Sequence, residues 1–437
     1  MPPPPRPARR RVGWVVAAVV GLLVAALVAT VVAVRPGVQA GAGAPRAVGQ
    51  RPAARLPADP STELPRLLAK RANAVLKGDR AAFLATVDKR QKAFYRQQAT
   101  EFANMRTVPF KALTYEVNDQ RTSTRLRRRY HADQAIEALV QARYRFQGQD
   151  LSPVLARHSY TFVLTRSVWR IAGRGDNQRR RDDTEIWDRG PVRTVRSVRT
   201  LIVYHPGQKA LAERLLRVAD RAYAQVGAAW SGRWERKAVI LVPRDEQEAE
   251  RLVGVRDLAR VAAVASSSVE SGATERVLGN RIVVNTDNVV RYNPLNLQVL
   301  ITHEMTHVAT RALGDGVPLL LVEGFADWAA LKPLGYPFAV TRPNLARAVH
   351  EGRFDGVLPR DPEFRDQDAA VAYDEGSAFC LWVADTYGVG KLQALYHEFK
   401  GSDPTGDTEL DRGFRRVLHL SLKKAQGRWA AWVRSKL

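Results

Sequence analysis

The stretch VLITHEMTHVAT (residues 299–310) carries two histidines four positions apart, flanked by apolar residues on both sides. Residues four apart lie on one face of an α-helix, so the imidazoles of His303 and His307 can reach a single metal ion. Zinc binds neutral imidazole, and a catalytic zinc ion keeps three protein ligands and one position for water. Glu304 lies beside this face, where its carboxylate can accept a proton from that water. The stretch therefore predicts a zinc-binding helix; the alternative is a helix that carries two histidines without a metal.

The sequence around this stretch fits one helix followed by a second. Asn293-Pro294 is a typical helix start, and the segment that follows is mostly apolar. A polar trio on such a helix costs several kcal/mol unless a partner such as a metal ion satisfies it. LLLVEGFADWAAL (319–331) begins a second helix after a short turn. If the two helices are antiparallel, Glu323 comes opposite both histidines as a third ligand, and Asp327 faces the same way, where it can hold a histidine N–H.

HEMTH followed by VEGFADW resembles the gluzincin metallopeptidases, the thermolysin- and aminopeptidase-like superfamily, in which the HExxH helix precedes a helix that carries a glutamate ligand. The resemblance covers residues 198–437. It implies Zn²⁺ as the cofactor, a peptide or protein as the substrate, and hydrolysis of peptide bonds by a zinc-activated water. It also implies a role for each matching residue: metal ligands His303, His307 and Glu323, general base Glu304, and Asp327 as the partner of a ligand histidine.

Two further expectations come from the same resemblance. The strand NRIVVNTD (280–287) matches the edge strand that lines the substrate cleft in these peptidases and pairs with an extended peptide. Tyr373, in AVAYDEGSAF (370–379), resembles the tyrosine with which some members stabilise the tetrahedral oxyanion. A tyrosine packed at the start of a helix is the alternative. No clear motif for holding a substrate's amine stands near 280–287, which favours an endopeptidase over an aminopeptidase.

Residues 198–437 are predicted to begin with strands and to continue with helices. Strands are expected at 199–206, 237–243, 261–270 and 280–287, with a long amphipathic helix at 207–232 and a short one at 245–254. From residue 294 to the C-terminus the pattern is almost wholly helical. This order predicts an α+β metallopeptidase domain in which a mixed sheet is followed by a helical subdomain.

Residues 62–192 are predicted to form a separate, small accessory α+β domain. Helical spacing gives way to strand patterns at 107–115 and 136–146 and to a hairpin over 159–173. This order of elements resembles the nuclear-transport-factor-2-like cone fold. Two arginine-rich clusters, 121–131 and 177–183, favour solvated loops, and contact with an anionic polymer is the alternative.

The N-terminus carries a targeting signal. Residues 12–34 contain no charge and are long enough to cross a bilayer, and four arginines precede them in the tail 1–11. This pattern predicts a single-pass transmembrane anchor in the cell membrane, with a cytoplasmic tail and an extracytoplasmic catalytic domain. The segment 35–61 is rich in proline, alanine and glycine and is expected to be a flexible linker. A signal peptide cleaved after VQA (38–40), which would leave a secreted protein, is the alternative.

Composition limits the partners and the source of stability. The net charge of +24 favours anionic surroundings, such as an anionic polymer of the cell envelope. Nucleic acid is not expected as a partner, because the anchor places the basic surface outside the cytoplasm. The single cysteine, Cys380, cannot form a disulfide within the chain, and its apolar neighbours predict a buried side chain. A competing function is a non-catalytic envelope binding or scaffold protein that grips such a polymer.

Overall fold

Two β-sheets and a large set of helices make up the described chain, an α+β architecture as the sequence predicts. The computed structural model describes residues 59–176, 182–270, 276–311, 316–366, 369–400 and 406–437. The predicted tail 1–11, the anchor 12–34 and the linker as far as residue 58 lie outside the described residues. Among the described residues, no helix combines the length and the apolar character needed to cross a membrane.

The N-terminal sheet is a four-stranded antiparallel meander in the order β1-β2-β3-β4, and α2 packs against β1 and β4. The predicted hairpin is confirmed as β3 and β4. The first helix begins two residues before the predicted start of the domain, because the Asp59 carboxylate caps it by accepting the Ser61 N–H at 3.0 Å. The elements of this accessory domain are α2 (Pro60–Lys77), α3 (Arg80–Ala85), α4 (Lys92–Met105), β1 (Phe110–Thr122), α5 (Thr124–Arg129), β2 (Gln134–Phe146), β3 (Val154–Thr165), β4 (Val168–Arg174) and the short 3₁₀ helix η1 (Ile186–Asp188).

The second sheet has five strands in the order β5-β6-β7-β9-β8. Its three inner strands, β6 (Thr200–Tyr204), β7 (Ala238–Val242) and β9 (Arg276–Val284), run parallel to one another. The two edge strands, β5 (Arg193–Arg196) and β8 (Ala263–Glu270), pair antiparallel with their neighbours. The predicted mixed sheet is therefore confirmed, and it also includes β5, which falls between the two predicted domains.

The expectation that residues 280–287 form the edge strand is wrong. β9 lies inside the sheet, between β7 and β8, and β8 is the edge strand. The cause is visible in the composition of the two strands. The apolar run at 282–284 suits a strand that is buried on both faces, whereas β8 contains three serines at 266–268.

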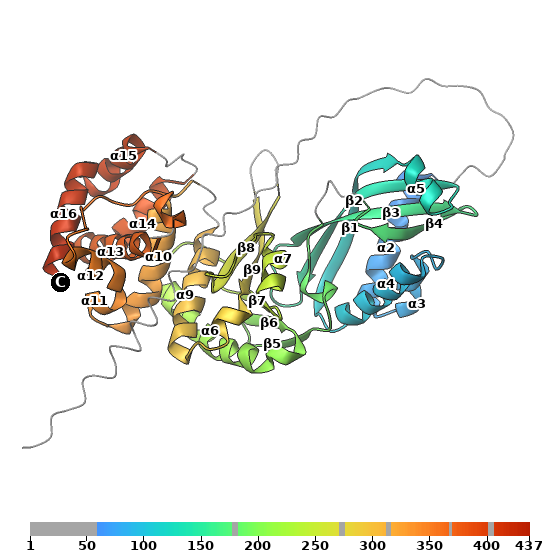
Figure 1. Cartoon of the computed structure of the whole chain (residues 1–437), viewed down its shortest axis with the longest axis horizontal. Helices are drawn as coiled ribbons and strands as arrows, with labels where there is room; N and C mark the ends of the chain where they lie inside the picture. Colours follow the sequence, from blue (N-terminus) through green and yellow to red (C-terminus); the bar gives the residue numbers. More distant parts are fainter. Residues whose placement is uncertain (1–58, 177–181, 271–275, 312–315, 367–368, 401–405) are drawn as a thin grey trace, which may run out of the picture.

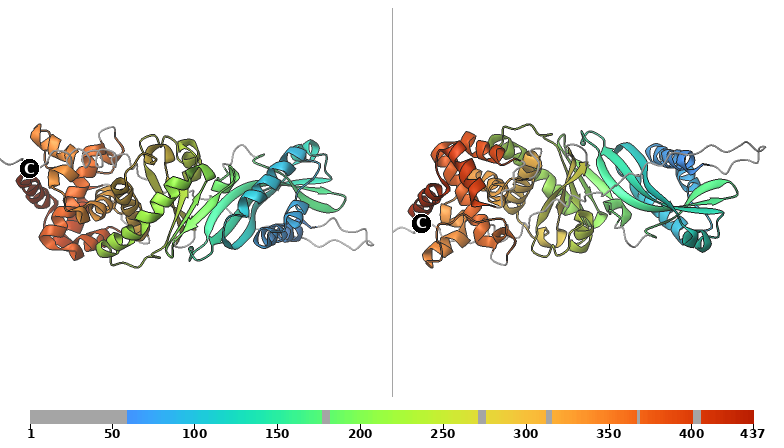
Figure 2. Two further views of the ribbon diagram at one scale, coloured as in Figure 1. Left: turned by 90° about the horizontal axis from the view of Figure 1, so that it is seen from below. Right: turned by 90° about the horizontal axis from the view of Figure 1, so that it is seen from above.

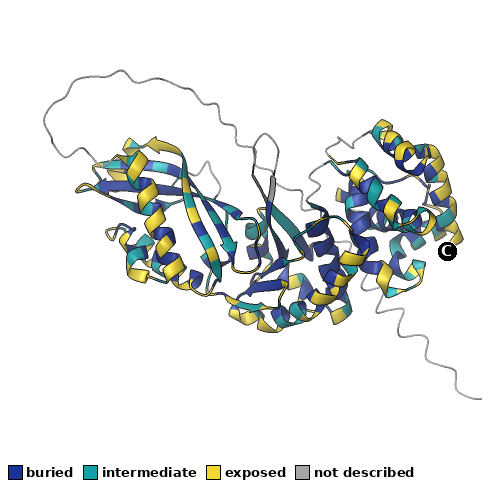
Figure 3. Cartoon of the chain, turned by 180° about the vertical axis from the view of Figure 1, so that it is seen from behind, coloured by how far each residue is buried: buried dark blue, intermediate teal, exposed yellow. Residues whose placement is uncertain are grey.

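The second sheet is the middle layer of the molecule. Successive side chains of a strand point to opposite faces, so Ile240 and Ile282 join the core shared with the C-terminal helices, while Leu241 and Val283 join the core shared with the accessory domain. Figures 1 and 2 show this sheet between the accessory domain and the C-terminal helices. The inner strands β6 and β7 are buried along their whole length, whereas the edge strand β5 is not (Figure 3).

Helices cover the face of the second sheet that points away from the accessory domain. α6 (Lys209–Ala229) packs against β6 and α9 (Pro294–Thr310), and α9 also contacts β8 and β9. α10 (Leu319–Leu331) packs on α9, and α13 (Ala369–Tyr387) packs on α10. Cys380 is fully buried in α13 and unpaired, as predicted. The other helices of this half are α7 (Glu246–Val253), α8 (Thr286–Val289), α11 (Phe338–Thr341), α12 (Pro343–His350), α14 (Val389–Glu398), α15 (Asp407–Leu418) and α16 (Leu422–Ser435).

Candidate metal centre

The HEMTH sequence lies in the second half of α9, a helix that runs through the interior of the C-terminal half. Asn293 caps the helix by accepting the Asn296 N–H at 2.8 Å, and Pro294 occupies the first turn, where its missing N–H costs nothing. Thr302 and Thr306 donate their hydroxyl hydrogens to carbonyl oxygens one turn earlier, both at 2.8 Å. These polar side chains are thus satisfied within the helix. His303, Glu304 and His307 have to find partners outside it.

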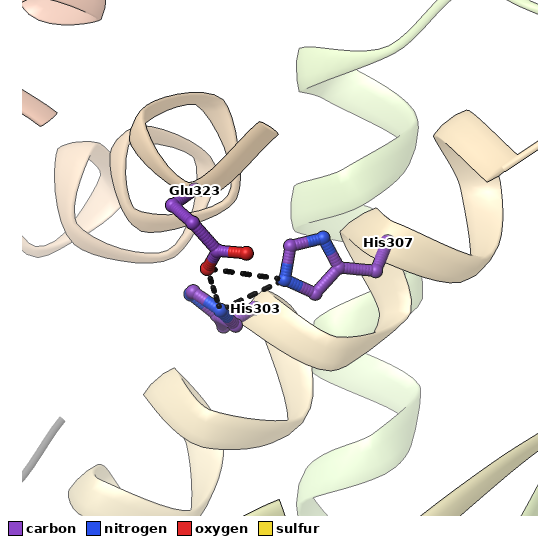
Figure 4. Close-up of side chains that lie close together, drawn as sticks. All are labelled: His303, His307 and Glu323. Atoms are coloured by element: carbon purple, nitrogen blue, oxygen red, sulfur yellow. Dashed lines mark hydrogen bonds and ion pairs between the residues drawn. The ribbon is translucent and has the colours of Figure 1, made fainter. Parts of the chain in front are cut away.

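Three potential ligand atoms converge between α9 and α10, from His303, His307 and Glu323 (Figure 4). The Nε2 atoms of the two histidines are 3.0 Å apart. Glu323 Oε2 lies 3.3 Å from His303 Nε2 and 3.5 Å from His307 Nε2. The structure therefore brings together the three residues that the sequence analysis named as ligands.

The orientation of His303 is set by Asp327, one turn after Glu323 on α10. His303 Nδ1 donates to Asp327 Oδ1 at 2.8 Å, since an ionised carboxylate can only accept. This contact turns Nε2 towards Glu323 and His307. A carboxylate on the far nitrogen of a ligand histidine is the usual way in which proteins fix the ring and its tautomer at a metal.

The donor set fits a zinc ion on two grounds. Ligand atoms about 2.0–2.1 Å from a tetrahedral zinc ion stand roughly 3.3 Å from one another, close to the three separations in this cluster. Among the described residues, Glu323 Oε2 is also a buried oxygen that no neighbour satisfies with hydrogen-bond geometry. A buried oxygen in this state is costly without a further partner, and a cation at the centre of the cluster supplies one.

The charges of the cluster also fit a bound cation. Burial raises the pKa of Glu323, but His307 and His303 together lower it to about 2, so this side chain is a carboxylate. Burial lowers the pKa of His303, while Asp327 and Glu323 raise it well above its ordinary value. A metal ion bound at this cluster would compete with a proton on His303.

The three side chains of the cluster differ in their exposure to solvent. The side chains of His303 and Glu323 are almost completely buried, whereas that of His307 is 18% exposed. His307 is therefore the member of the cluster that solvent reaches most, and a catalytic zinc ion needs water or substrate at its fourth position.

Glu304 lies next to the cluster and in contact with the second sheet. It is 2% exposed and accepts a hydrogen bond from the backbone N–H of Ala265 on the edge strand β8. Burial raises the pKa of Glu304, and the two histidines lower it by a smaller amount. A buried carboxylate with a raised pKa is suited to accept and release a proton near neutral pH.

Tyr373 lies in the second turn of α13. It is buried, and its ring packs edge-on against Phe364 with the ring centres 5.3 Å apart. Gly376, one turn later on α13, touches the backbone of Gly324, the neighbour of Glu323. Tyr373 is therefore carried by the helix that packs directly on α10, and its part in chemistry stays a prediction.

Two features of the site could not be predicted from the sequence. The first is the backbone of Ala265, because main-chain groups leave no signature in a sequence. The second is Arg342, which is buried, donates to Ser377 Oγ at 2.9 Å and is attracted by Asp374 and Asp327. Burial lowers the pKa of Arg342 to about 10, so the guanidinium stays charged, and Asp327 and Asp374 attract this charge. Only the fold brings residue 342 to this place.

Comparison with known proteins adds no assignment. No family model matches the chain, and no curated protein matches it. The function therefore has to be argued from the arrangement of the residues themselves.

Proposed function

We propose that this protein is a zinc-dependent metallopeptidase of the gluzincin type. The observation that carries the proposal is the convergence of His303 Nε2, His307 Nε2 and Glu323 Oε2 at separations of 3.0–3.5 Å. Asp327 behind His303 and Glu304 beside the cluster complete the set of groups that peptide hydrolysis at a zinc ion requires.

The residues of the chain divide the chemistry among them. His303, His307 and Glu323 would hold a zinc ion, which would lower the pKa of a bound water and polarise the scissile carbonyl. The Glu304 carboxylate takes the proton of the attacking water and delivers it to the nitrogen of the leaving amine. The Ala265 N–H bonds to this carboxylate and holds it in position. Tyr373 is our candidate donor to the oxyanion, and a purely packing role is the alternative.

The edge strand β8 supports a peptide as the substrate. An edge strand presents backbone N–H and C=O groups that an extended peptide can pair with, and β8 lies directly beside Glu304. Pairing along an edge needs no free terminus on the peptide, so an endopeptidase is favoured over an aminopeptidase.

We infer that the site works outside the cytoplasm. The uncharged run 12–34 after an arginine-rich tail is the basis for a membrane anchor, and secretion after cleavage near residue 40 is the alternative. The helix-then-strand order of the accessory domain supports a cone of the nuclear-transport-factor-2 type.

A second candidate function has one observation in its favour. Arg125, Arg127 and Arg128 on α5 are exposed, and the net charge of the chain is +24. A scaffold protein that grips anionic envelope polymer through this surface would bind it in a salt-sensitive manner. Such binding would survive the loss of His303 and His307, whereas peptide hydrolysis would not.

The test uses the purified full chain in detergent. We expect about one zinc ion per chain and zinc-dependent hydrolysis of an unstructured protein such as casein, both lost in His307→Ala. His350→Ala is the matched control, since His350 is exposed at the end of α12 and is not part of the cluster. A wild-type protein that binds no zinc, or a His307→Ala variant as active as the wild type, would refute the proposal.

A further inference from the structure

A buried ion pair joins the accessory domain to strand β9. Arg281 Nη1 donates to Asp150 Oδ1 at 2.8 Å, and Arg281 Nη2 donates to Asp150 Oδ2 at 2.9 Å. Arg281 is 7% exposed and Asp150 is 8% exposed. The guanidinium also lies over the Phe146 ring, 4.6 Å from its centre. A two-point contact of this kind fixes the relative orientation of its partners, because both hydrogen bonds need one geometry.

The carboxylate of this pair is itself held firmly. Asp150 Oδ2 accepts the backbone N–H of Phe146 at 2.7 Å, at the end of β2. Burial lowers the pKa of the Arg281 guanidinium, but Asp150, Tyr144 and Glu185 together raise it above its ordinary value, so Arg281 stays charged. The accessory domain thus presents a fixed negative charge to β9.

Backbone contacts add to the ion pair. The Gly279 N–H donates to Pro153 O at 3.2 Å. A Cβ atom on residue 279 would lie 2.5 Å from Val154 Cγ2, so only glycine lets β9 approach the start of β3 this closely. Lys237 Nζ also donates to Gly148 O at 2.5 Å. One continuous hydrophobic core spans both domains around these contacts.

Only strand β8 lies between the Asp150–Arg281 ion pair on β9 and the metal centre. Arg281 stands opposite Ser266 of β8, and Ile282 stands opposite Ala265. Ser267 Oγ donates to Asn280 Oδ1 at 2.6 Å and ties β8 to β9 by side chains as well. Ala265 donates its N–H to Glu304. The accessory domain, β9, β8 and α9 thus form a direct series of contacts.

We propose that the accessory domain positions the substrate-binding edge of the metal centre, with Asp150 and Arg281 as positioning residues that clamp β9 and, through it, β8. The accessory domain is then part of the working site and not an independent appendage. The effect on substrate binding rests on the proposed peptidase function. The effect on how rigidly strand β8 is held does not depend on that function.

The experiment compares Asp150→Asn with the wild-type full chain, both loaded with zinc. We expect faster amide hydrogen exchange at residues 263–267 of β8. We also expect KM for an unstructured peptide to rise by about tenfold and kcat to change by less than about twofold, because the variant loosens the edge that binds peptide and leaves the chemical groups in place. Zinc content should stay the same.

Two further variants keep the result interpretable. Asp150→Asn leaves a buried guanidinium without its partner, which can unfold the domain by itself. The double variant Asp150→Asn/Arg281→Gln removes both charges and should show the same rise in exchange and in KM. Asp183→Asn is the matched control. Asp183 pairs with Arg157 inside the accessory domain, and their side chains are 36% and 32% exposed. This ion pair does not involve the second sheet.

The outcomes separate the two proposals. Wild-type exchange in β8 and wild-type KM in the double variant would overturn the clamp and leave the peptidase proposal standing. A wild-type chain without zinc-dependent hydrolysis would overturn the peptidase proposal, while exchange in β8 would still decide whether the clamp exists.

Discussion

His303 and Asp327 hold each other across the contact between α9 and α10: His303 Nδ1 donates to Asp327 Oδ1 over 2.8 Å. This bond leaves His303 Nε2 facing Glu323 Oε2 at 3.3 Å and His307 Nε2 at 3.0 Å. These contacts bring the three potential ligand atoms together, and each contact can be tested separately.

Asp327→Asn should weaken zinc binding by about 10- to 100-fold, because an amide orients His303 less firmly and makes its other nitrogen a poorer donor to the metal. Competition with a fluorescent zinc chelator measures the change. Asp385→Asn is the matched control, since Asp385 pairs with Lys332 at the surface at 2.7 Å. Equal zinc affinity for wild type and Asp327→Asn would contradict a role for this bond at the metal.

Zinc binding should release about one proton per ion near neutral pH. Burial lowers the pKa of His303, but Asp327 and Glu323 raise it well above its ordinary value, so an ion would have to displace a proton. Zinc affinity should accordingly rise with pH and fall as the solution becomes more acidic. Calorimetric titrations in two buffers with different ionisation enthalpies count the protons, and an identical apparent enthalpy in both buffers would refute the prediction.

Gly324→Ala should destabilise the protein by about 1–3 kcal/mol and reduce zinc content. A Cβ atom on residue 324 would overlap the carbonyl group of Gly376, so α13 would have to move away from α10 and disturb the neighbouring Glu323. Gly427→Ala in α16 is the control, because nothing lies within 4 Å of the added carbon. That control should be stabilised by roughly 0.5–1 kcal/mol, as a helical alanine is favoured over glycine. Thermal unfolding distinguishes the two directions.

Tyr373→Phe should keep the packing on Phe364 and the zinc content, while kcat falls by about 10²–10³ through loss of the oxyanion donor. The measurement is steady-state kinetics together with thermal unfolding. An unchanged kcat would make Tyr373 a packing residue, the alternative that the sequence leaves open.

Local patterns predicted the parts of the molecule that depend on neighbouring residues. Helix α10, the mixed sheet and the β3–β4 hairpin follow from the spacing of apolar residues and from turn signals. The three converging ligands followed from two short motifs on successive helices, because few residues separate α9 from α10 along the chain. These features need no knowledge of distant contacts.

Where a feature depends on contacts between distant parts of the chain, the prediction was wrong or the feature was missed. The predicted position of β9 at the edge of the sheet was wrong. The strand that pairs with β7 lies inside the sheet, and that strand is β9, which leaves β8 at the edge. Arg342 reaches the neighbourhood of Asp327 only through the packing of helices, and the Asp150–Arg281 pair spans 131 positions of the chain. No window of sequence contains both partners of such a contact.

The most direct test of the central claim is peptide hydrolysis by Glu304→Gln at the same zinc content as the wild type. Glutamine keeps the shape of the side chain but cannot accept the proton of the attacking water. The account predicts full zinc occupancy in both proteins and a kcat lower by about a thousandfold in the variant. Equal kcat in the two zinc-loaded proteins would contradict it.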